Sequence, residues 1–223
     1  MSNSERAQEP LNSVKTPTKR KIVAGQTNPR EMTVTLKLLA RSEQCQTSLC
    51  ARQGQLLVIK QASGAALQQL ELEAQALNAL HDLPGVPRLL THQHGLLERS
   101  YLDGLTLQAV RGDRTLPRRQ ISYWLQNLRN LLEEIHARGL WHGDVCPANV
   151  LIRPDQQVAL LDWGGPDWGT PPYRRPELSG PEADRFALRQ LCEELLGQSD
   201  PGDGPNRPLL IGREQELDLL VRA

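Results

Sequence analysis

The sequence has few aromatic residues and no long apolar run. Four tryptophans, three tyrosines and one phenylalanine are its only aromatic residues among 223, so the core must be largely aliphatic, chiefly leucine. No apolar stretch approaches the roughly 20 residues that span a bilayer, and residues 1–30 lack the apolar segment of a secretory signal. We therefore expect no membrane span and a cytoplasmic location, although the polar N-terminal tail is compatible with export as an effector.

Excess charge of either sign is also absent. The 26 Lys and Arg residues balance the 26 Asp and Glu residues, and the isoelectric point is about 7.0. A chain without a net field is not suited to holding a polyanion by bulk charge, so we expect no nucleic-acid partner. Cys45, Cys50, Cys146 and Cys192 lack the paired short spacings of a zinc ribbon, which argues against a disulfide scaffold or structural zinc and predicts mostly buried thiols.

Hydrophobic periodicity divides the chain into four parts. Residues 1–30 form a polar tail that cannot bury enough surface to fold, and residues 198–223 form a Pro/Gly linker followed by a helix over 213–221. Between them, residues 31–103 combine short strand-like runs with one helix, and residues 104–197 are mainly helical. Strands are expected at 34–40, 49–53, 56–60, 86–91, 95–102, 150–152 and 158–161, and helices at 65–80, 117–137 and 182–196. This pattern predicts an α+β fold with a small antiparallel sheet in its first half.

Three short motifs occur in an informative order: LVIK at 57–60, HGDVCPAN at 142–149 and LDWG at 161–164. Together they resemble the strand lysine, catalytic loop and metal-binding loop of the protein-kinase-like fold, over roughly residues 33–197. A fourth segment, GTPPYRRPE at 169–177, resembles the substrate-binding segment of protein kinases. The resemblance implies a two-lobed fold with a small antiparallel-sheet N-lobe (31–103) and a truncated helical C-lobe (104–197), as in minimal or atypical bacterial Ser/Thr kinases.

Phosphoryl transfer needs a cation on the nucleotide phosphates, oxygen ligands for Mg²⁺ and a carboxylate facing the acceptor hydroxyl. By resemblance, Lys60 binds the phosphates of ATP and Glu73 orients Lys60. Asp144 orients or deprotonates the acceptor hydroxyl of a protein substrate. Asn149 and Asp162 are hard oxygen donors that would ligate Mg²⁺.

Further residues are assigned on the same basis. Glu73 is preferred to Glu71 because it has Leu77 and Leu80 at plus four and plus seven, the spacing of a helix face that packs. Val58 and Leu151 are expected to bind the nucleotide, with Val58 against the adenine. A buried Asp184 would anchor the catalytic loop, and Arg185 is a candidate partner for Glu177.

Several positions depart from the kinase pattern. The stretch 40–47, where kinases have a glycine-rich hairpin over the phosphates, contains no glycine. Gly143 replaces the catalytic-loop arginine, so activation by phosphorylation of the short segment between Asp162 and Glu177 is not expected. Cys146 replaces a lysine that contacts the γ-phosphate in protein Ser/Thr kinases.

These features leave three functions open. The first is an atypical protein Ser/Thr kinase that uses ATP and Mg²⁺. The second is a pseudokinase that binds proteins, supported by the missing glycines and by Cys146. The third is a small-molecule kinase of the aminoglycoside or choline type, because the 142–149 motif resembles that group's loop as well. The segment 169–177 favours a protein acceptor over the third function.

Overall fold

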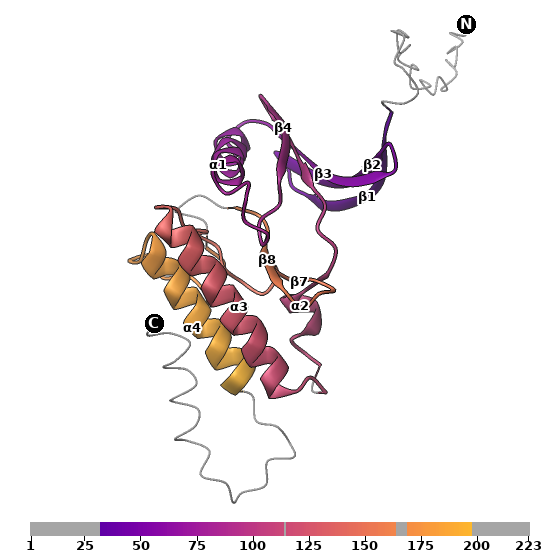
Figure 1. The fold of residues 1–223 in the computed structure, drawn as a ribbon. Coiled ribbons are helices and arrows are strands. Elements are labelled where there is room, and N and C mark those ends of the chain that lie inside the picture. Colours follow the sequence, from indigo (N-terminus) through magenta and orange to yellow (C-terminus); the bar gives the residue numbers. More distant parts are fainter. Residues whose placement is uncertain (1–31, 114, 164–168, 198–223) are drawn as a thin grey trace, which may run out of the picture. The chain divides into compact units, whose positions relative to one another are not determined.

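The computed structural model describes residues 32–113, 115–163 and 169–197, and its first half is built on a five-stranded antiparallel sheet (Figure 1). The strands lie in the order β1-β2-β3-β5-β4, so β3 occupies the middle of the sheet. A turn at Gln53 and Gly54, both with positive φ, connects β2 to β3. The strand bounds are β1 (Thr33–Arg41), β2 (Cys45–Arg52), β3 (Gln55–Ala62), β4 (Leu89–Gln93) and β5 (Leu96–Ser100).

Helix α1 (Ala66–Ala79) follows β3 and packs against the sheet. Its buried residues are Leu70, Glu73, Ala74 and Leu77, which recur at helical spacing, so the one carboxylate among them lies on the apolar face. The preceding Ala65 has no side chain that can cap the helix. Its amide instead donates to Gln44 Oε1 at 3.1 Å, which ties the β1–β2 turn to the start of α1.

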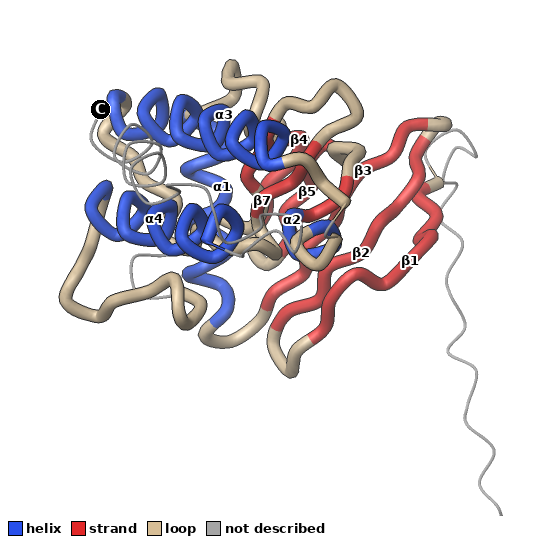
Figure 2. The backbone as a smooth tube through the Cα atoms, turned by 90° about the horizontal axis from the view of Figure 1, so that it is seen from below, coloured by secondary structure: helices blue, strands red, loops and turns tan. Residues whose placement is uncertain are grey.

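The second half of the described chain is mainly helical. Helices α3 (Arg118–Ala137) and α4 (Pro181–Gly197) lie side by side in Figure 1 and again in Figure 2. A short sheet in the order β6-β7-β8 packs on α3 through β8. The remaining bounds are β6 (Leu105–Thr106), α2 (Leu107–Val110), β7 (Val150–Ile152) and β8 (Val158–Leu160).

The core is aliphatic, as the scarcity of aromatic residues predicts. The apolar stripe of α3 is buried from Trp124 to Ile135, and only Ile121 of the predicted stripe stays half-buried. Fully buried leucines link the helices to both sheets; they include Leu77, Leu97, Leu128, Leu160 and Leu191. The α+β fold with an antiparallel sheet preceding the helices is confirmed.

The structure differs from the predicted elements in three places. Strand β2 begins at Cys45, four residues before the predicted start, because polar residues continue its ladder with β3. The β6 and α2 elements were not predicted, since two and four residues are too short for a hydrophobic period. The strand expected at 86–91 lies at Leu89–Gln93 instead and includes His92, whose Nε2 is 3.3 Å from Glu71 Oε2.

The predicted tail (1–30) and the predicted linker and helix (198–223) lie outside the described residues. Among the described residues, no helix combines the length and the apolar character needed to cross a bilayer.

Candidate active site

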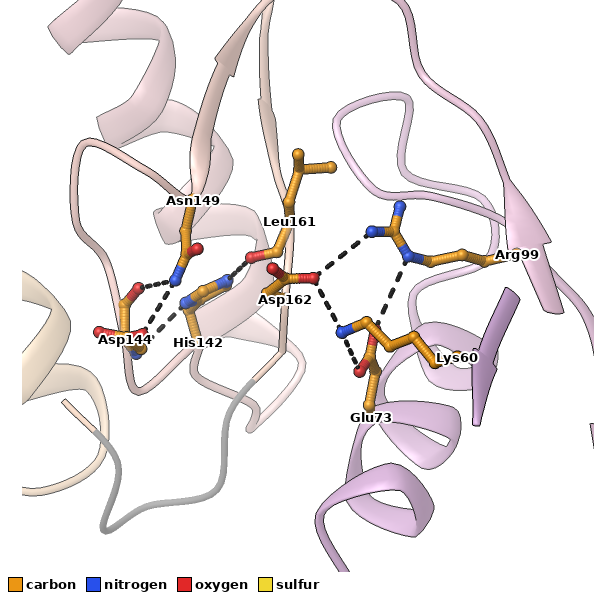
Figure 3. Close-up of polar contacts among 8 residues, drawn as sticks. All are labelled: Lys60, Glu73, Arg99, His142, Asp144, Asn149, Leu161 and Asp162. Atoms are coloured by element: carbon orange, nitrogen blue, oxygen red, sulfur yellow. Dashed lines mark hydrogen bonds and ion pairs between the residues drawn. The ribbon is translucent and has the colours of Figure 1, made fainter. Parts of the chain in front are cut away.

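Lys60 lies between two carboxylates that come from distant segments (Figure 3). Its Nζ is 2.7 Å from Glu73 Oε2 and 2.8 Å from Asp162 Oδ1. The central strand β3 supplies Lys60, the buried face of α1 supplies Glu73, and the residues after β8 supply Asp162. The fold therefore brings together three of the residues selected from the sequence.

Arg99 in β5 belongs to the same cluster, and the sequence analysis did not identify it. Its Nη2 is 3.4 Å from Asp162 Oδ1, and its Nε is 3.8 Å from Glu73 Oε1. Arg99 pairs directly with Val58 in the sheet, so its side chain shares the face that carries Val58 and Lys60. A signal for this placement existed, because strand alternation puts Arg99 on the same face as the buried Leu97.

Opposite charges keep Lys60 and Asp162 ionised. Burial alone would lower the pKa of Lys60, but the negative charges of Glu73 and Asp162 outweigh burial and raise it. Burial alone would raise the pKa of Asp162, but the positive charges of Lys60 and Arg99 outweigh it and lower that pKa. Lys60 is therefore a cation and Asp162 an anion at neutral pH.

The carboxylate of Asp144 is held from two sides. Asn149 Nδ2 donates to Asp144 Oδ2 and to its backbone oxygen, both at 2.9 Å, and the Thr170 amide donates to Asp144 Oδ1 at 2.8 Å. These bonds fix the orientation of Asp144 and leave the amide oxygen of Asn149 as the atom that could bind a metal ion. Gly143, immediately before Asp144, has φ +83°, a conformation that other residues adopt only with strain.

A buried aspartate anchors the loop that carries Asp144. Asp184 in α4 is 1% exposed and accepts hydrogen bonds from the amides of His142 and Gly143, at 2.8 and 2.9 Å. His142 Nε2 in turn lies 2.9 Å from the backbone oxygen of Leu161, next to Asp162 (Figure 3). The predicted role of Asp184 is thus confirmed by its contacts, and His142 connects the two loops of the site.

The suggested pairing of Arg185 with Glu177 is wrong. Arg185 Nη1 contacts Glu182 Oε1 at 2.6 Å, one turn away on the exposed side of α4. Glu182 and Arg185 are three residues apart in α4, a spacing that places side chains next to each other on a helix, whereas Glu177 precedes the helix.

A cavity of about 810 Å³ opens onto these side chains, a size typical of ligand sites. The β1–β2 turn forms one wall and contains no glycine. Ser42 Oγ closes this turn by accepting a hydrogen bond from the Cys45 amide at 3.0 Å. Val58 and Leu151 are buried and do not line this cavity. The lining residues are Ser42, Glu43, Gln44, Cys45, Lys60, Ala65, Ala66, Gln69, Leu70, Glu73, Asp144, Asn149, Asp162, Trp163, Gly169, Thr170 and Arg174.

The oxygen donors at the cavity fit Mg²⁺. Within the described ranges, no group of three or more His, Cys, Asp or Glu side chains forms a metal cage. Mg²⁺ does not require such a cage, because it commonly binds one or two protein oxygens and takes further ligands from phosphates and water. The carboxylate of Asp162, whose side chain is 53% exposed, and the amide oxygen of Asn149 offer such a donor set.

The four cysteines differ in accessibility, which gives a direct check on the cavity. Cys45 lines the cavity and is half-buried, whereas Cys50, Cys146 and Cys192 are buried, and all four are free thiols. Burial, and then the nearby charge of Asp144, raises the pKa of Cys146 and keeps its thiol neutral at pH 7. We expect one thiol of the native protein to react with a maleimide at pH 7, and Cys45→Ser to remove that reaction. Rapid labelling of Cys146, located by mass spectrometry, would contradict the described site.

Comparisons with known proteins agree with this geometry. The model of the phosphotransferase enzyme family matches residues 51–173, more than half of the chain. "Serine/threonine-protein kinase B" of Synechocystis sp. is 34% identical over 106 residues, which is 44% of this chain and 18% of that protein. "Probable SapB synthase" of Streptomyces coelicolor is 31% identical over 122 residues, 46% of this chain and 13% of that protein.

The matched part of the chain therefore corresponds to less than a fifth of either relative. The family match covers Lys60, Glu73, Asp144, Asn149 and Asp162, and it confirms the kinase-like fold. This chain belongs to the phosphotransferase enzyme family.

Proposed function

We propose that this protein is an atypical Ser/Thr protein kinase that transfers a phosphoryl group from ATP with the help of Mg²⁺. The observation that carries the proposal is one cavity lined by Lys60, Glu73, Asp144, Asn149 and Asp162. This set supplies a cation for phosphates, oxygen donors for a metal and a carboxylate for the acceptor, which are the needs of phosphoryl transfer.

Each side chain has a distinct task in this mechanism. Lys60 is held by Glu73 and binds phosphate oxygens of ATP. Asp162 and Asn149 would hold Mg²⁺, which would supply positive charge to the phosphates. Asp144, fixed by Asn149 and the Thr170 amide, accepts a hydrogen bond from the acceptor hydroxyl and takes its proton as transfer proceeds.

We assign Val58 and Leu151 to the adenine side of the nucleotide site. Val58 lies on the same face of β3 as Lys60, two residues away, and is 2% exposed. Leu151 in β7 is 4% exposed. Because neither residue lines the cavity around Lys60, the base would bind beyond that cavity, toward the apolar residues of the sheets.

A protein acceptor is favoured by the segment that begins at Gly169. Its Thr170 amide is bonded directly to Asp144, and the Thr170 carbonyl accepts the Tyr173 amide at 2.8 Å. Tyr173 is buried and its hydroxyl donates a hydrogen bond to Glu194 of α4. The segment is therefore anchored beside the carboxylate of Asp144. An extended peptide laid along it would present a hydroxyl to Asp144. The relative named as a Ser/Thr protein kinase supports the same reading.

A second candidate is a small-molecule kinase. The family match spans proteins described broadly as phosphotransferases, and the 142–149 loop resembles that of aminoglycoside and choline kinases. The same Lys60, Asp144 and Asp162 would serve this reaction, so the acceptor alone separates the two candidates.

The acceptor is tested by incubating the full chain with γ-labelled ATP and Mg²⁺, in parallel with casein, kanamycin and choline. We expect label on serine or threonine of the protein acceptor or of the chain itself, and none with Asp144→Asn. Label confined to kanamycin or choline would contradict a protein kinase and favour the second candidate. Nucleotide binding without transfer to any acceptor would contradict both and identify a pseudokinase.

A further inference from the structure

Asp162, which the proposed function assigns to metal binding, contacts two cationic side chains, Lys60 and Arg99. Asp162 Oδ1 contacts Lys60 Nζ at 2.8 Å and Arg99 Nη2 at 3.4 Å. The transfer mechanism uses Lys60 to bind phosphates but gives no task to Arg99. The Arg99 side chain is only 6% exposed, so its charge is directed at this cluster and not at solvent.

Charge balance explains why an arginine is tolerated there. Glu73 and Asp162 both contact Lys60, so without Arg99 this buried lysine would face two carboxylates, of which Glu73 is buried as well. Arg99 makes the group of four neutral, which lowers the cost of burying it. Because a guanidinium is a planar fork with five donors, Arg99 can reach both carboxylates at once.

The contact between Arg99 and Glu73 is incomplete. Arg99 Nε and Glu73 Oε1 are both buried, and within the described chain neither has a hydrogen-bond partner. They face each other at 3.8 Å, beyond hydrogen-bond distance (Figure 3). A small shift of the guanidinium toward Glu73 would let Arg99 Nε donate a hydrogen bond to Glu73 Oε1. In its present position the guanidinium also contacts Asp162.

We propose that Arg99 competes with the divalent cation for Asp162 and moves onto Glu73 when the cation binds. In the structure the guanidinium of Arg99 lies against Asp162 and offsets its charge. A divalent cation at Asp162 repels the guanidinium, and the unsatisfied Glu73 Oε1 offers it an alternative acceptor a short distance away. Arg99 is thus a positioning residue that weakens metal binding at Asp162 and supports the Lys60–Glu73 pair once the metal is bound. This inference rests on the proposed metal-binding role of Asp162.

The test compares Mn²⁺ binding, followed by the electron paramagnetic resonance signal of free Mn²⁺, in the full chain and its variants. Arg99→Met removes the competing charge while keeping an unbranched side chain, and we expect it to bind Mn²⁺ about five- to tenfold more tightly than wild type. Arg99→Lys keeps the charge but cannot span both carboxylates, and should show a smaller gain. Arg52→Met is the matched control, because Arg52 pairs with Glu98 at 2.6 Å on the opposite face of the same sheet. Its Mn²⁺ affinity should equal that of wild type.

The outcomes separate this inference from the proposed function. If Asp162→Asn abolishes Mn²⁺ binding but Arg99→Met binds equally or more weakly than wild type, the metal site stands and the competition is overturned. If Mn²⁺ does not bind, or binds without regard to Asp162, both are overturned. Should Arg99→Met fail to fold in a melting experiment, the inference is decided by Arg99→Lys, whose affinity must then exceed that of wild type.

A second readout follows the guanidinium itself. In nitrogen-15 spectra of the arginine side chains, the Nε–H resonance that is missing from Arg99→Lys should move downfield on addition of Mg²⁺, as a new hydrogen bond to Glu73 forms. No movement of this resonance at a Mg²⁺ concentration that saturates the site would contradict the shift.

Discussion

Asp144→Asn is expected to lower phosphoryl transfer by about 10²- to 10⁴-fold. The variant keeps the shape of the side chain but removes the carboxylate that accepts the proton of the acceptor hydroxyl. Asp144 also accepts bonds from Asn149 Nδ2 and the Thr170 amide, and the remaining amide oxygen retains one of them. The rate is measured under single-turnover conditions with γ-labelled ATP, and ATP affinity is measured on the same protein.

The control for this variant is Asp155→Asn. Asp155 lies in the turn between β7 and β8, and its carboxylate also accepts a backbone amide, that of Gln157 at 3.1 Å. Both variants therefore weaken a hydrogen bond from a backbone amide to an aspartate, but of the two aspartates only Asp144 lines the cavity. Asp155→Asn should transfer at the wild-type rate. An undiminished rate in Asp144→Asn, or a loss that merely parallels a fall in melting temperature, would contradict the assigned role.

Asp184→Ala is expected to have the largest effect on stability. It leaves the buried amides of His142 and Gly143 without their acceptor and removes the contact with His136 Nε2 at 3.0 Å. Losing one member of such a buried charged network typically lowers the free energy of unfolding by about 3 to 5 kcal/mol. For a chain of this size that corresponds to a fall in melting temperature of about 10 °C or more, measured by circular dichroism or calorimetry.

Glu182→Ala provides the comparison. Glu182 lies in the same first turn of α4 as Asp184, so both substitutions remove a negative charge from the same helix end. The Glu182 side chain is 67% exposed, and its ion pair is with Arg185, which is exposed as well. We expect a change within about 0.5 kcal/mol. Equal effects of the two variants would show that Asp184 acts through the helix dipole and does not anchor the catalytic loop.

Resemblance to the kinase motifs selected Lys60, Asp144 and Asp162 of the cavity, and a local pattern selected Glu73. Glu73 was preferred to Glu71 because of apolar residues at plus four and plus seven, and the structure buries Glu73 against Lys60. Glu71 instead is exposed and contacts His92 of β4. The helix period sorted these two acids correctly because burial of a helix face depends on residues close in the sequence.

Contacts between distant segments could not be predicted in this way. Strand alternation places Arg99 on the buried face of β5, but no local pattern shows that Glu73 and Asp162 face it there. The capping of α1 by Gln44, twenty-one residues before Ala65, depends on how the β1–β2 turn folds back. The absence of glycine from this turn was visible, whereas the role of Ser42 in closing it was not.

The central claim is that the cavity around Lys60 binds ATP together with Mg²⁺, and titration calorimetry tests it most directly. We predict Mg²⁺-dependent binding of ATP with a dissociation constant in the high micromolar range, within the interval of about 1 μM to 1 mM common for enzyme substrates. Lys60→Met should weaken the binding, and Asp162→Asn should remove its dependence on Mg²⁺. Absence of any binding heat or thermal shift at millimolar Mg²⁺ and ATP, with wild-type protein that is folded by circular dichroism, would contradict the account.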